Sequence, residues 1–459
     1  MYGDSNFASS SDSQSIIRID NGKAKEESDD DIIWLDEEGV PTDTSAGIKN
    51  EEICIKTEAR IVQHHRYHPN PVKRERLDEH FDVLSMYAFK LKGVTLRSLD
   101  LIPSVPPLKV DNYKSFFLMS YNVLCETTLE KHKFLHHHLL NINYGWEDRW
   151  NLISSELRSL KSDIYCLQGV QKERPVACYK LFFEEKGMNG FFTGRGGSKG
   201  DGCAIFWNPS KFNAIEKIPI NLDYNVENLD RPNVAQLIRF KHIPTGKELI
   251  VVNTHLLYDP NRGDIKIYQL TIILAHIQKA RTKNQPIIFC GDLNIYPDSP
   301  IYKLIIDGKL HCRETFCVPK SMSGQQFKCR PTAMQLFKIP KITKVATDCT
   351  INEKKTRIHP LLSHAICFES VHSHHANNKE KEISAIGFSY YFNSDYIFYS
   401  IEKKESVEDN VKNVVENGLF LHRRLSLPDA KTMTKFVGPL PYFTSGSDHL
   451  PLYAEFYLN

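Results

Sequence analysis

The chain has 459 residues, and 41% of them are hydrophobic, so it can bury a substantial core in one large domain or in two smaller ones. Its 58 Lys and Arg residues nearly balance its 56 Asp and Glu residues, which excludes a protein that binds nucleic acid through bulk positive charge. A nucleic-acid partner would therefore have to be bound in a local groove.

The cysteine pattern and the absence of targeting segments bear on location. The 11 cysteines are scattered and form no Cys-x-x-Cys pair, and some, such as Cys166 and Cys290, lie inside apolar segments. This is typical of reduced thiols in an intracellular protein. The amino terminus has no signal-peptide pattern, and the sequence has no run of ~20 apolar residues. We expect no membrane partner, and a cytoplasmic or nuclear location, or both.

Residues 1–112 are predicted to form a flexible tail and lead-in. Up to about residue 81 this region is rich in Ser, Asp, Glu and Lys and has little apolar periodicity. Such a segment cannot bury enough surface to offset its ordering entropy. Residues 29–38 place apolar side chains between acidic flanks, the form of a short segment that adds a strand to a partner's sheet. The tail is therefore the candidate contact for a protein partner.

Residues 113–459 are predicted to form the folded domain, and its first strands end in polar residues. Residues 116–121 are predicted as a strand that is followed by Asn122. The helical period of residues 146–160 then leads to a second strand at 164–167. Strand, helix and strand in this order indicate a sheet whose active edge collects side chains from several strands.

The apolar run 286–290 is predicted as a buried strand, because it is too short for a helix and has β-branched residues. It ends in Asp292 and Asn294. Two side chains that lie two residues apart at the carboxyl end of a strand point the same way, into the crevice where open α/β sheets bind ligands. Residues 249–255 form another buried run with a polar end.

The Gly-rich loop 193–202 does not fit the P-loop pattern, because a Ser stands where the second Gly should precede the Lys. Arg195 and Lys199 in this loop are candidates to contact a phosphate backbone. A flexible hairpin loop is the alternative interpretation.

The apolar pattern weakens from about residue 311 to 382 into Lys, Ser, Thr and His, which predicts a polar insertion into the domain. The cysteines and histidines of this segment do not have zinc-site spacing, so we assign no metal there. Strand-like residues return at 394–400. The chain closes with Asp448, His449 and a last strand at 452–457.

Several short motifs stand in one order, each beside a predicted strand, and together they resemble the endonuclease/exonuclease/phosphatase family. They are Ser-Tyr-Asn122, Leu-Gln-Gly169-Val, Asn253-Thr-His255, Gly-Asp292-Leu-Asn294, Asp395-Tyr-Ile and Ser-Asp448-His449. Three longer runs, 200–205, 253–266 and 395–400, resemble the Angel subfamily, relatives of the mRNA deadenylases. The resemblance covers roughly residue 113 to the carboxyl terminus.

The resemblance implies an α/β fold of two facing mixed β-sheets flanked by helices, a four-layer α/β sandwich. It also implies cleavage of a phosphoester with Mg²⁺, or Mn²⁺ as the alternative, and mRNA 3′ ends as the expected partner. Mg²⁺ takes oxygen ligands and keeps waters, so a sparse set of carboxylates and amides is a suitable shell.

Catalytic roles follow from the same resemblance. Asp292 would orient or deprotonate the attacking water, and Asn294 and Asn122 would hydrogen-bond the phosphoryl oxygens. His449, steadied by Asp395, would donate a proton to the phosphate.

The remaining expected contacts are a second donor, metal ligands and substrate contacts. His255 would be the second donor at the scissile phosphate. Asp448 and Asn122 would help to hold the metal. The candidate substrate contacts are Arg195, Lys199, Asn253 and Arg262.

One residue departs from the family pattern. Where the family has a Glu that is a principal metal ligand, this chain has Gly169. If the missing carboxylate costs ~3 kcal/mol at the transition state, the rate falls ~10²-fold. Water or Glu126 could fill the vacant position.

Two hypotheses follow from these residues. The first is a metal-dependent phosphoesterase that shortens RNA 3′ ends or removes their terminal phosphates. The second is an inactive relative that binds RNA or a protein partner, and Gly169 favours it. A lipid or inositol phosphatase is a third reading, against which the Angel-like runs argue.

Overall fold

A computed structural model describes the residues given at the end of this paragraph, and all of them belong to one compact unit. The predicted tail up to residue 89, with its candidate partner segment, lies outside them. The described residues are 90–91, 94–102, 114–140, 144–172, 174–223, 231–259, 262–282, 285–311, 361–375, 380–388, 390–403, 414–415 and 418–459.

The first of two large sheets has seven strands, and β4 and β5 are its parallel pair. Its other neighbouring strands are antiparallel. The strand order is β3 (Leu99–Leu101), β20 (Leu419–Leu425), β21 (Leu452–Leu458), β4 (Ser115–Asn122), β5 (Ile164–Gln171), β7 (Asp201–Trp207) and β6 (Asn189–Gly194).

The second large sheet has six strands, with β10 and β11 as its parallel pair. The other pairs in this sheet are antiparallel. The order is β14 (Phe368–Ser370), β17 (Asp395–Ser400), β11 (Ile287–Asp292), β10 (Glu248–His255), β9 (Val234–His242) and β8 (Phe212–Asn221).

The remaining elements are helices and small two-stranded ladders. The helices are α3 (Glu126–Lys131), η1 (Lys133–Leu135), η2 (His137–Leu139), α4 (Trp146–Ser159), α5 (Arg174–Glu184), α6 (Gly263–Ala280), α7 (Pro300–Asp307) and α10 (Ala430–Phe436). The ladders pair β1 (Lys90–Leu91) with β2 (Val94–Thr95), β12 (Lys309–His311) with β13 (Leu361–Ser363), β15 (Ala385–Ile386) with β16 (Tyr391–Phe392), and β18 (Glu402–Lys403) with β19 (Val414–Val415).

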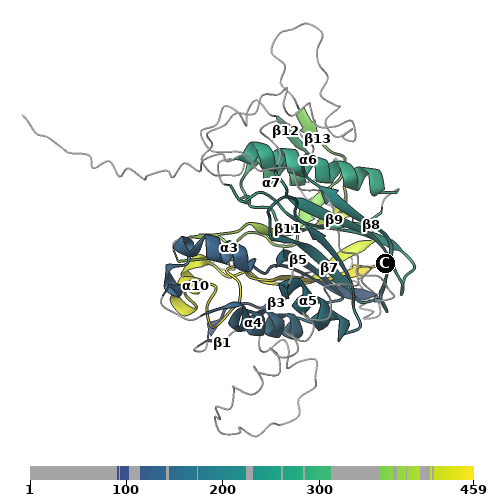
Figure 1. Ribbon diagram of the computed structural model, residues 1–459. Coiled ribbons are helices and arrows are strands. Elements are labelled where there is room, and N and C mark those ends of the chain that lie inside the picture. The colour runs from purple at the N-terminus through teal and green to yellow at the C-terminus, as the bar shows by residue number, and fades with distance from the viewer. Residues whose placement is uncertain are drawn as a thin grey trace, which may run out of the picture. The chain divides into compact units, whose positions relative to one another are not determined.

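Both faces of each large sheet are apolar, and the strand period of two divides the core into layers. In β11, Ile288 packs between the two sheets, whereas Ile287 and Phe289 pack toward α6 and α7. In β5, Cys166 faces the other sheet, whereas Tyr165 packs toward α4 and α5. Figure 1 shows α6 and α7 beside β8 and β9, and α4 and α5 beside β5 and β7. The predicted four-layer α/β sandwich is confirmed.

Two edge strands come from regions that the sequence pattern placed outside the core. β3 lies within the predicted lead-in and pairs with β20. β14 lies within the predicted insertion and pairs with β17. Leu362, Ile366 and Phe368 are buried against the outer core, so the last part of the expected insertion returns to the domain. Among the described residues, no helix is long and apolar enough to cross a membrane.

Candidate active site

Strand ends from both sheets meet at one edge and carry the predicted polar residues. β10 and β11 run parallel, and their register pairs His255 with Asp292. β17 runs antiparallel to β11, so its first residue, Asp395, pairs with Asp292. Asn122 ends β4 in the other sheet, and His449 lies three residues before β21, in an isolated bridge with Ala385. The topology therefore gathers five predicted site residues in one place.

Asp292 lies at the centre of this group and is 1% exposed. Its Oδ2 accepts a hydrogen bond from Nδ2 of Asn122 at 2.9 Å and lies 3.4 Å from Nε2 of His255. Its Oδ1 accepts from the backbone N–H of Asn294 at 3.0 Å. The carboxylate is thus held in one orientation by residues from both sheets.

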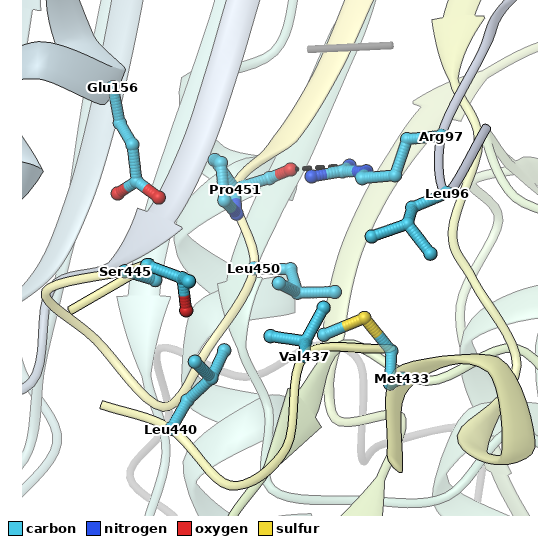
Figure 2. A pocket seen from close by; sticks show the side chains of 10 residues that line it. Leu96, Arg97, Glu156, Met433, Val437, Leu440, Ser445, Leu450 and Pro451 are labelled. Carbon is cyan, nitrogen blue, oxygen red and sulfur yellow. Dashed lines mark hydrogen bonds between the residues drawn. The ribbon is translucent and has the colours of Figure 1, made fainter. Parts of the chain in front are cut away.

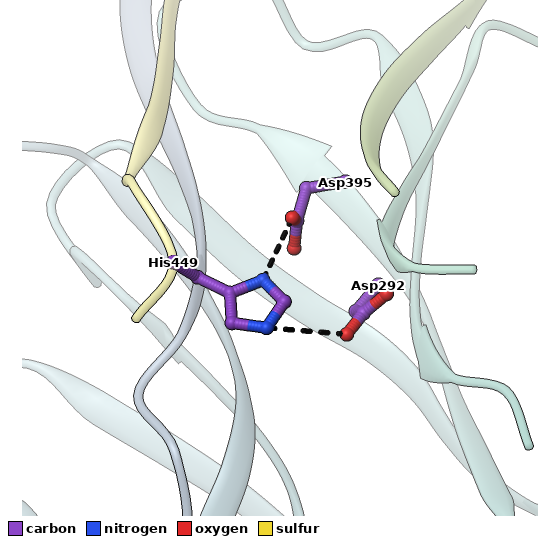
Figure 3. Close-up of side chains that lie close together, drawn as sticks. All are labelled: Asp292, Asp395 and His449. Atoms are coloured by element: carbon purple, nitrogen blue, oxygen red, sulfur yellow. Dashed lines mark hydrogen bonds and ion pairs between the residues drawn. The ribbon is translucent and has the colours of Figure 1, made fainter. Parts of the chain in front are cut away.

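His449 lies between two carboxylates (Figure 3). Its Nδ1 is 2.8 Å from Oδ2 of Asp395, and its Nε2 is 3.8 Å from Oδ2 of Asp292. Asp395 also accepts a hydrogen bond from the Ser384 hydroxyl at 2.6 Å. This geometry fixes the imidazole ring and directs Nε2 toward Asp292.

The surrounding charges favour the imidazolium form of His449. Burial lowers the pKa of this residue, but the carboxylates of Asp395, Asp448 and Asp292 outweigh burial and raise the pKa to about 10. At neutral pH, Nε2 therefore carries a proton that it can donate.

Asp448 offers an oxygen that is not committed to a hydrogen bond. Its Oδ2 accepts from the Tyr390 hydroxyl at 2.6 Å. Its Oδ1 is buried, lies 3.8 Å from Nε2 of His449, and has no hydrogen-bond partner among the described residues. A buried anionic oxygen of this kind is a ready ligand for a cation.

These residues fit a divalent cation held by few protein ligands. Asp292, Asp395 and His449 offer ligand atoms within 4.8 Å of one another. Asp395 and His449 are hydrogen-bonded to each other, however, so Asp292 and Asp448 are the more suitable ligands for the cation. Mg²⁺ is commonly held by one or two carboxylates, with water and substrate phosphate completing its shell.

Gly169, where the family Glu would stand, adopts a left-handed backbone conformation with φ +66°. It lies at an irregularity in the pairing of β5 with β7. A Cβ at this position would lie 2.8 Å from Oδ1 of Asn122. That oxygen accepts a hydrogen bond from the N–H of Leu124 at 3.0 Å. The space next to Gly169 is therefore filled by the Asn122 amide.

Glu126 does not fill the position of the missing Glu in this structure. Its carboxylate lies 2.5 Å from Nη1 of Arg149, whose side chain is fully buried. The guanidinium also donates to the carbonyls of Val123, Leu124 and Gly446. Glu126 is thus committed to a buried ion pair.

The structure places the predicted substrate contacts in different settings. Asn253 is 0% exposed, and its amide is hydrogen-bonded to Gln168, Leu167 and Ala204, so it joins the two sheets; a substrate contact by this residue stays a prediction. Arg195 forms an ion pair with Asp201 at 3.1 Å.

The other two predicted substrate contacts and Asn294 differ in exposure. Lys199 is exposed, and Arg262 is half-buried immediately before α6. Asn294 is 7% exposed, and its Nδ2 donates to the carbonyl of Leu256 at 3.1 Å. A phosphate contact by Asn294 remains a prediction.

Supporting residues were missed by the sequence interpretation. Arg149 anchors the segment after Asn122, and it falls on the apolar stripe of α4, four residues before Ile153, where a charged residue is a signal of a buried ion pair. The Ser447 hydroxyl donates to the carbonyl of Asn122 at 2.7 Å. Tyr390 had no comparable signal, because its contact with Asp448 depends on the tertiary fold.

Comparison with known proteins relates the chain to characterised relatives. The pattern of the Endonuclease/Exonuclease/phosphatase family matches residues 119–449. "Protein angel homolog 2" from Homo sapiens is 32% identical over an alignment of 384 residues, and the match covers 76% of this chain and 70% of that protein. The crystal structure of ANGEL2, a 2′,3′-cyclic phosphatase, has a TM-score of 0.67 at 31% identity and covers 80% of this chain and 99% of that one.

A second crystal structure of ANGEL2 contains adenosine-2′,3′-vanadate. It is 30% identical, has a TM-score of 0.66, and covers 80% of this chain and 99% of that one.

Proposed function

Because the chain belongs to the endonuclease/exonuclease/phosphatase family and is an Angel homologue, we propose that it is a metal-dependent phosphoesterase that acts on terminal phosphates at RNA 3′ ends. The likeness to ANGEL2, a 2′,3′-cyclic phosphatase, favours a 2′,3′-cyclic phosphate as the group that is hydrolysed. Stepwise shortening of the RNA 3′ end is the second activity to be tested. The proposed location is the cytoplasm, the nucleus or both.

The observation that carries this proposal is the chain of contacts from Asp395 through His449 to Asp292. Opening a cyclic phosphate requires a water that attacks phosphorus and a proton for the leaving sugar oxygen. Asp292 accepts hydrogen bonds and is the candidate base for the water. His449, with its raised pKa, is the candidate acid.

The developing negative charge on the phosphate oxygens needs donors and cations. Asn122 has its amide nitrogen directed at Oδ2 of Asp292, and Nε2 of His255 lies 3.4 Å from the same oxygen. Asp448 and Asp292 would hold a divalent cation. When bound, that ion would polarise the phosphoryl group and neutralise its charge.

The alternative function is RNA binding without turnover, and Gly169 is the observation that favours it. Loss of the family carboxylate removes one ligand and one negative charge from the metal site. The two aspartates that remain support weaker metal binding, so we expect activity to need a higher concentration of Mg²⁺ or Mn²⁺ than a site with three carboxylates.

The test uses 5′-labelled RNAs that end in a 2′,3′-cyclic phosphate, a 3′-phosphate or a 3′-hydroxyl poly(A) tract. We expect metal-dependent opening or removal of the cyclic phosphate. Gel separation of the labelled RNAs and release of phosphate measure these reactions. Asp292→Asn should lower kcat at least ~10²-fold, because it removes the base. The matched control is Asp307→Asn, an exposed carboxylate at the end of α7, which should retain full activity.

Two results would decide against this function. Shortening of the poly(A) RNA with no change in the cyclic phosphate would identify a 3′ exonuclease. RNA binding without turnover of any of the three ends, at millimolar Mg²⁺ or Mn²⁺, would identify the inactive relative.

A further inference from the structure

Two cavities outside the catalytic contacts differ greatly in size. The smaller has a volume of about 30 Å³ and lies among Leu96, Arg97, Glu156 and Ser445 (Figure 2). The Arg97 guanidinium is directed at the carbonyl of Pro451 and donates to it at 2.7 Å. A space of this size holds one or two waters and no larger ligand.

The larger cavity has a volume of about 460 Å³, which is within the range of small-molecule sites. Its walls come from four segments, 296–298, 373–375, 381–383 and 391–393. We refer to it below as the 296–393 cavity.

The 296–393 cavity is next to the catalytic residues. The ring of Phe392, which lines it, is 6.2 Å from the ring of His449. The Tyr396 hydroxyl lies 2.9 and 3.0 Å from the carbonyl oxygens of Ile295 and Asn393 and can donate to either, so it links the wall at Asn393 to the residue before the wall 296–298. A polymer whose terminal phosphate lies at His449 could therefore place a neighbouring group in this cavity.

The outer part of the cavity offers an aromatic ring and a cation. Tyr391 is 61% exposed, so its ring face is open to a stacking partner. The Lys381 side chain is 80% exposed and lies 3.8 Å from Asp298 at the rim. Exposed aromatic rings beside cations are the usual means by which proteins bind single-stranded RNA.

The wall of the cavity contains two buried acceptors that lack donors. Asn393 is 3% exposed and Glu382 is 4% exposed. Oδ1 of Asn393 and Oε2 of Glu382 have no hydrogen-bond partner among the described residues. A buried polar atom without a partner costs ~1–3 kcal/mol, so a ligand that brings a donor to this wall would be favoured.

The Asn393 amide has His374 as its neighbour. Burial lowers the pKa of His374 to about 4, so this imidazole is neutral at pH 7. Its Nε2 is 2.7 Å from the Tyr302 hydroxyl, and its Nδ1 is 3.4 Å from Nδ2 of Asn393. With its proton on Nε2, the ring donates to Tyr302 and accepts at Nδ1 from the Asn393 amide nitrogen, an arrangement that leaves Oδ1 of Asn393 as an acceptor.

We propose that the 296–393 cavity binds one nucleobase of the RNA, from a nucleotide upstream of the terminal phosphate, and selects bases that carry an exocyclic amino group. This inference rests on RNA being the substrate in the proposed function. The base stacks on Tyr391, and its amino group donates to Asn393 and Glu382. Uracil has a carbonyl oxygen where adenine and cytosine have the exocyclic amino group, so that oxygen faces the two acceptors, and its one remaining donor, N3–H, can reach only one of them.

The test measures binding rather than turnover, with the full chain carrying Asp292→Asn so that the RNA stays intact. Fluorescently labelled five-nucleotide RNAs of adenosine, cytidine or uridine are titrated, and Kd is read from anisotropy. We expect uridine RNA to bind ~10-fold more weakly than adenosine or cytidine RNA. Tyr391→Ala should weaken adenosine RNA ~10-fold, since loss of one stacked base commonly has an effect of this size.

Two further variants separate the cavity from general RNA affinity. Glu382→Gln keeps the side-chain shape but replaces one acceptor oxygen by a donor, so discrimination against uridine should fall at least ~3-fold. Phe443→Ala removes an aromatic ring that is 56% exposed and does not line the cavity, and it should leave every Kd unchanged. Thermal unfolding of each variant verifies that it is folded.

Equal Kd values for the three RNAs, or a Tyr391→Ala variant that binds like its parent, would overturn the inference. These results are independent of catalysis. An active protein with no base preference would support the proposed function and contradict base binding in the cavity. An inactive protein that binds adenosine RNA through Tyr391 would support base binding in the cavity and contradict the proposed phosphoesterase activity.

Discussion

An added Cβ on Gly169 would lie 2.8 Å from Oδ1 of Asn122, a distance that real Cβ atoms essentially never adopt. The same glycine has φ +66°, where side chains other than Gly are strained. The backbone conformation of β5 at this position therefore suits Gly, the residue that departs from the family pattern. A carboxylate cannot be added at this position without displacing Asn122, which is the donor to Asp292.

This relationship predicts that Gly169→Ala destabilises the protein by about 3 kcal/mol or more, because backbone strain and a steric clash add. Gly187→Ala is the matched control. Gly187 also has φ +66°, but nothing lies within 4 Å of its added Cβ, so only the strain of about 1 kcal/mol remains. Urea denaturation measures both free energies of unfolding.

Gly169→Glu should be at least as destabilised as Gly169→Ala and should not increase phosphoesterase activity. A Gly169→Glu variant that is stable and faster than the unmodified chain would show that the backbone of β5 can relax around a family-type Glu. Equal losses of unfolding free energy in Gly169→Ala and Gly187→Ala would show that the Asn122 side chain moves aside without a measurable cost.

A second prediction concerns the partner of the imidazole. Asp395→Asn removes the nearest carboxylate that raises the pKa of His449, so the pKa should move from about 10 toward its ordinary value of 6.5. The protonated acid is then lost at a lower pH. We expect the basic limb of the kcat/KM profile to shift down by up to about three pH units, with a fall of up to ~30-fold at pH 8 if the pKa reaches 6.5.

The exposed control Asp307→Asn should keep the profile of the unmodified chain. A basic limb that stays in place in Asp395→Asn would mean that Asp448 and Asp292 alone hold the proton on His449, or that another group is the acid.

The strand ends were predictable because local patterns mark them. The β-branched run before Asp292 stops at a Gly and a polar pair, and this alone predicts a buried strand with a site at its end. Arrangements that depend on distant segments were not predictable. Asn253 also follows an apolar run, yet its side chain is enclosed between the sheets by Gln168 from β5. β14 is too short for a periodic pattern and becomes a strand only by pairing with β17.

A third prediction tests the buried ion pair behind the site. Arg149→Leu should destabilise the protein by ~3–5 kcal/mol, because it leaves the Glu126 carboxylate and the carbonyls of Val123 and Gly446 without their donor. The control is Arg158→Leu at an exposed position of the same helix, and this substitution should lower the free energy of unfolding by less than ~1 kcal/mol. Chemical denaturation compares the two. Similar losses would show that the Arg149 contacts add nothing beyond helix packing.

The fourth prediction is an acid-dependent loss of stability caused by His372. Its side chain is 3% exposed, and its Nε2 donates to the carbonyl of Leu425 at 3.0 Å. Burial lowers the pKa of His372 to about 3, whereas in the unfolded chain the pKa is near 6.5. Between these values the unfolded state binds more protons than the folded state, so stability falls as the pH falls below 6.5.

This single group should contribute up to ~1.4 kcal/mol of lost stability per pH unit below pH 6.5. His372→Gln retains an amide donor for Leu425 but does not titrate, so its disadvantage relative to the unmodified chain should shrink between pH 7 and pH 5. Urea denaturation at pH 7, 6 and 5 measures this difference. His137→Gln, at an exposed position, should leave the pH dependence unchanged. A constant difference between His372→Gln and the unmodified chain across this range would mean that His372 binds protons equally in the folded and unfolded states.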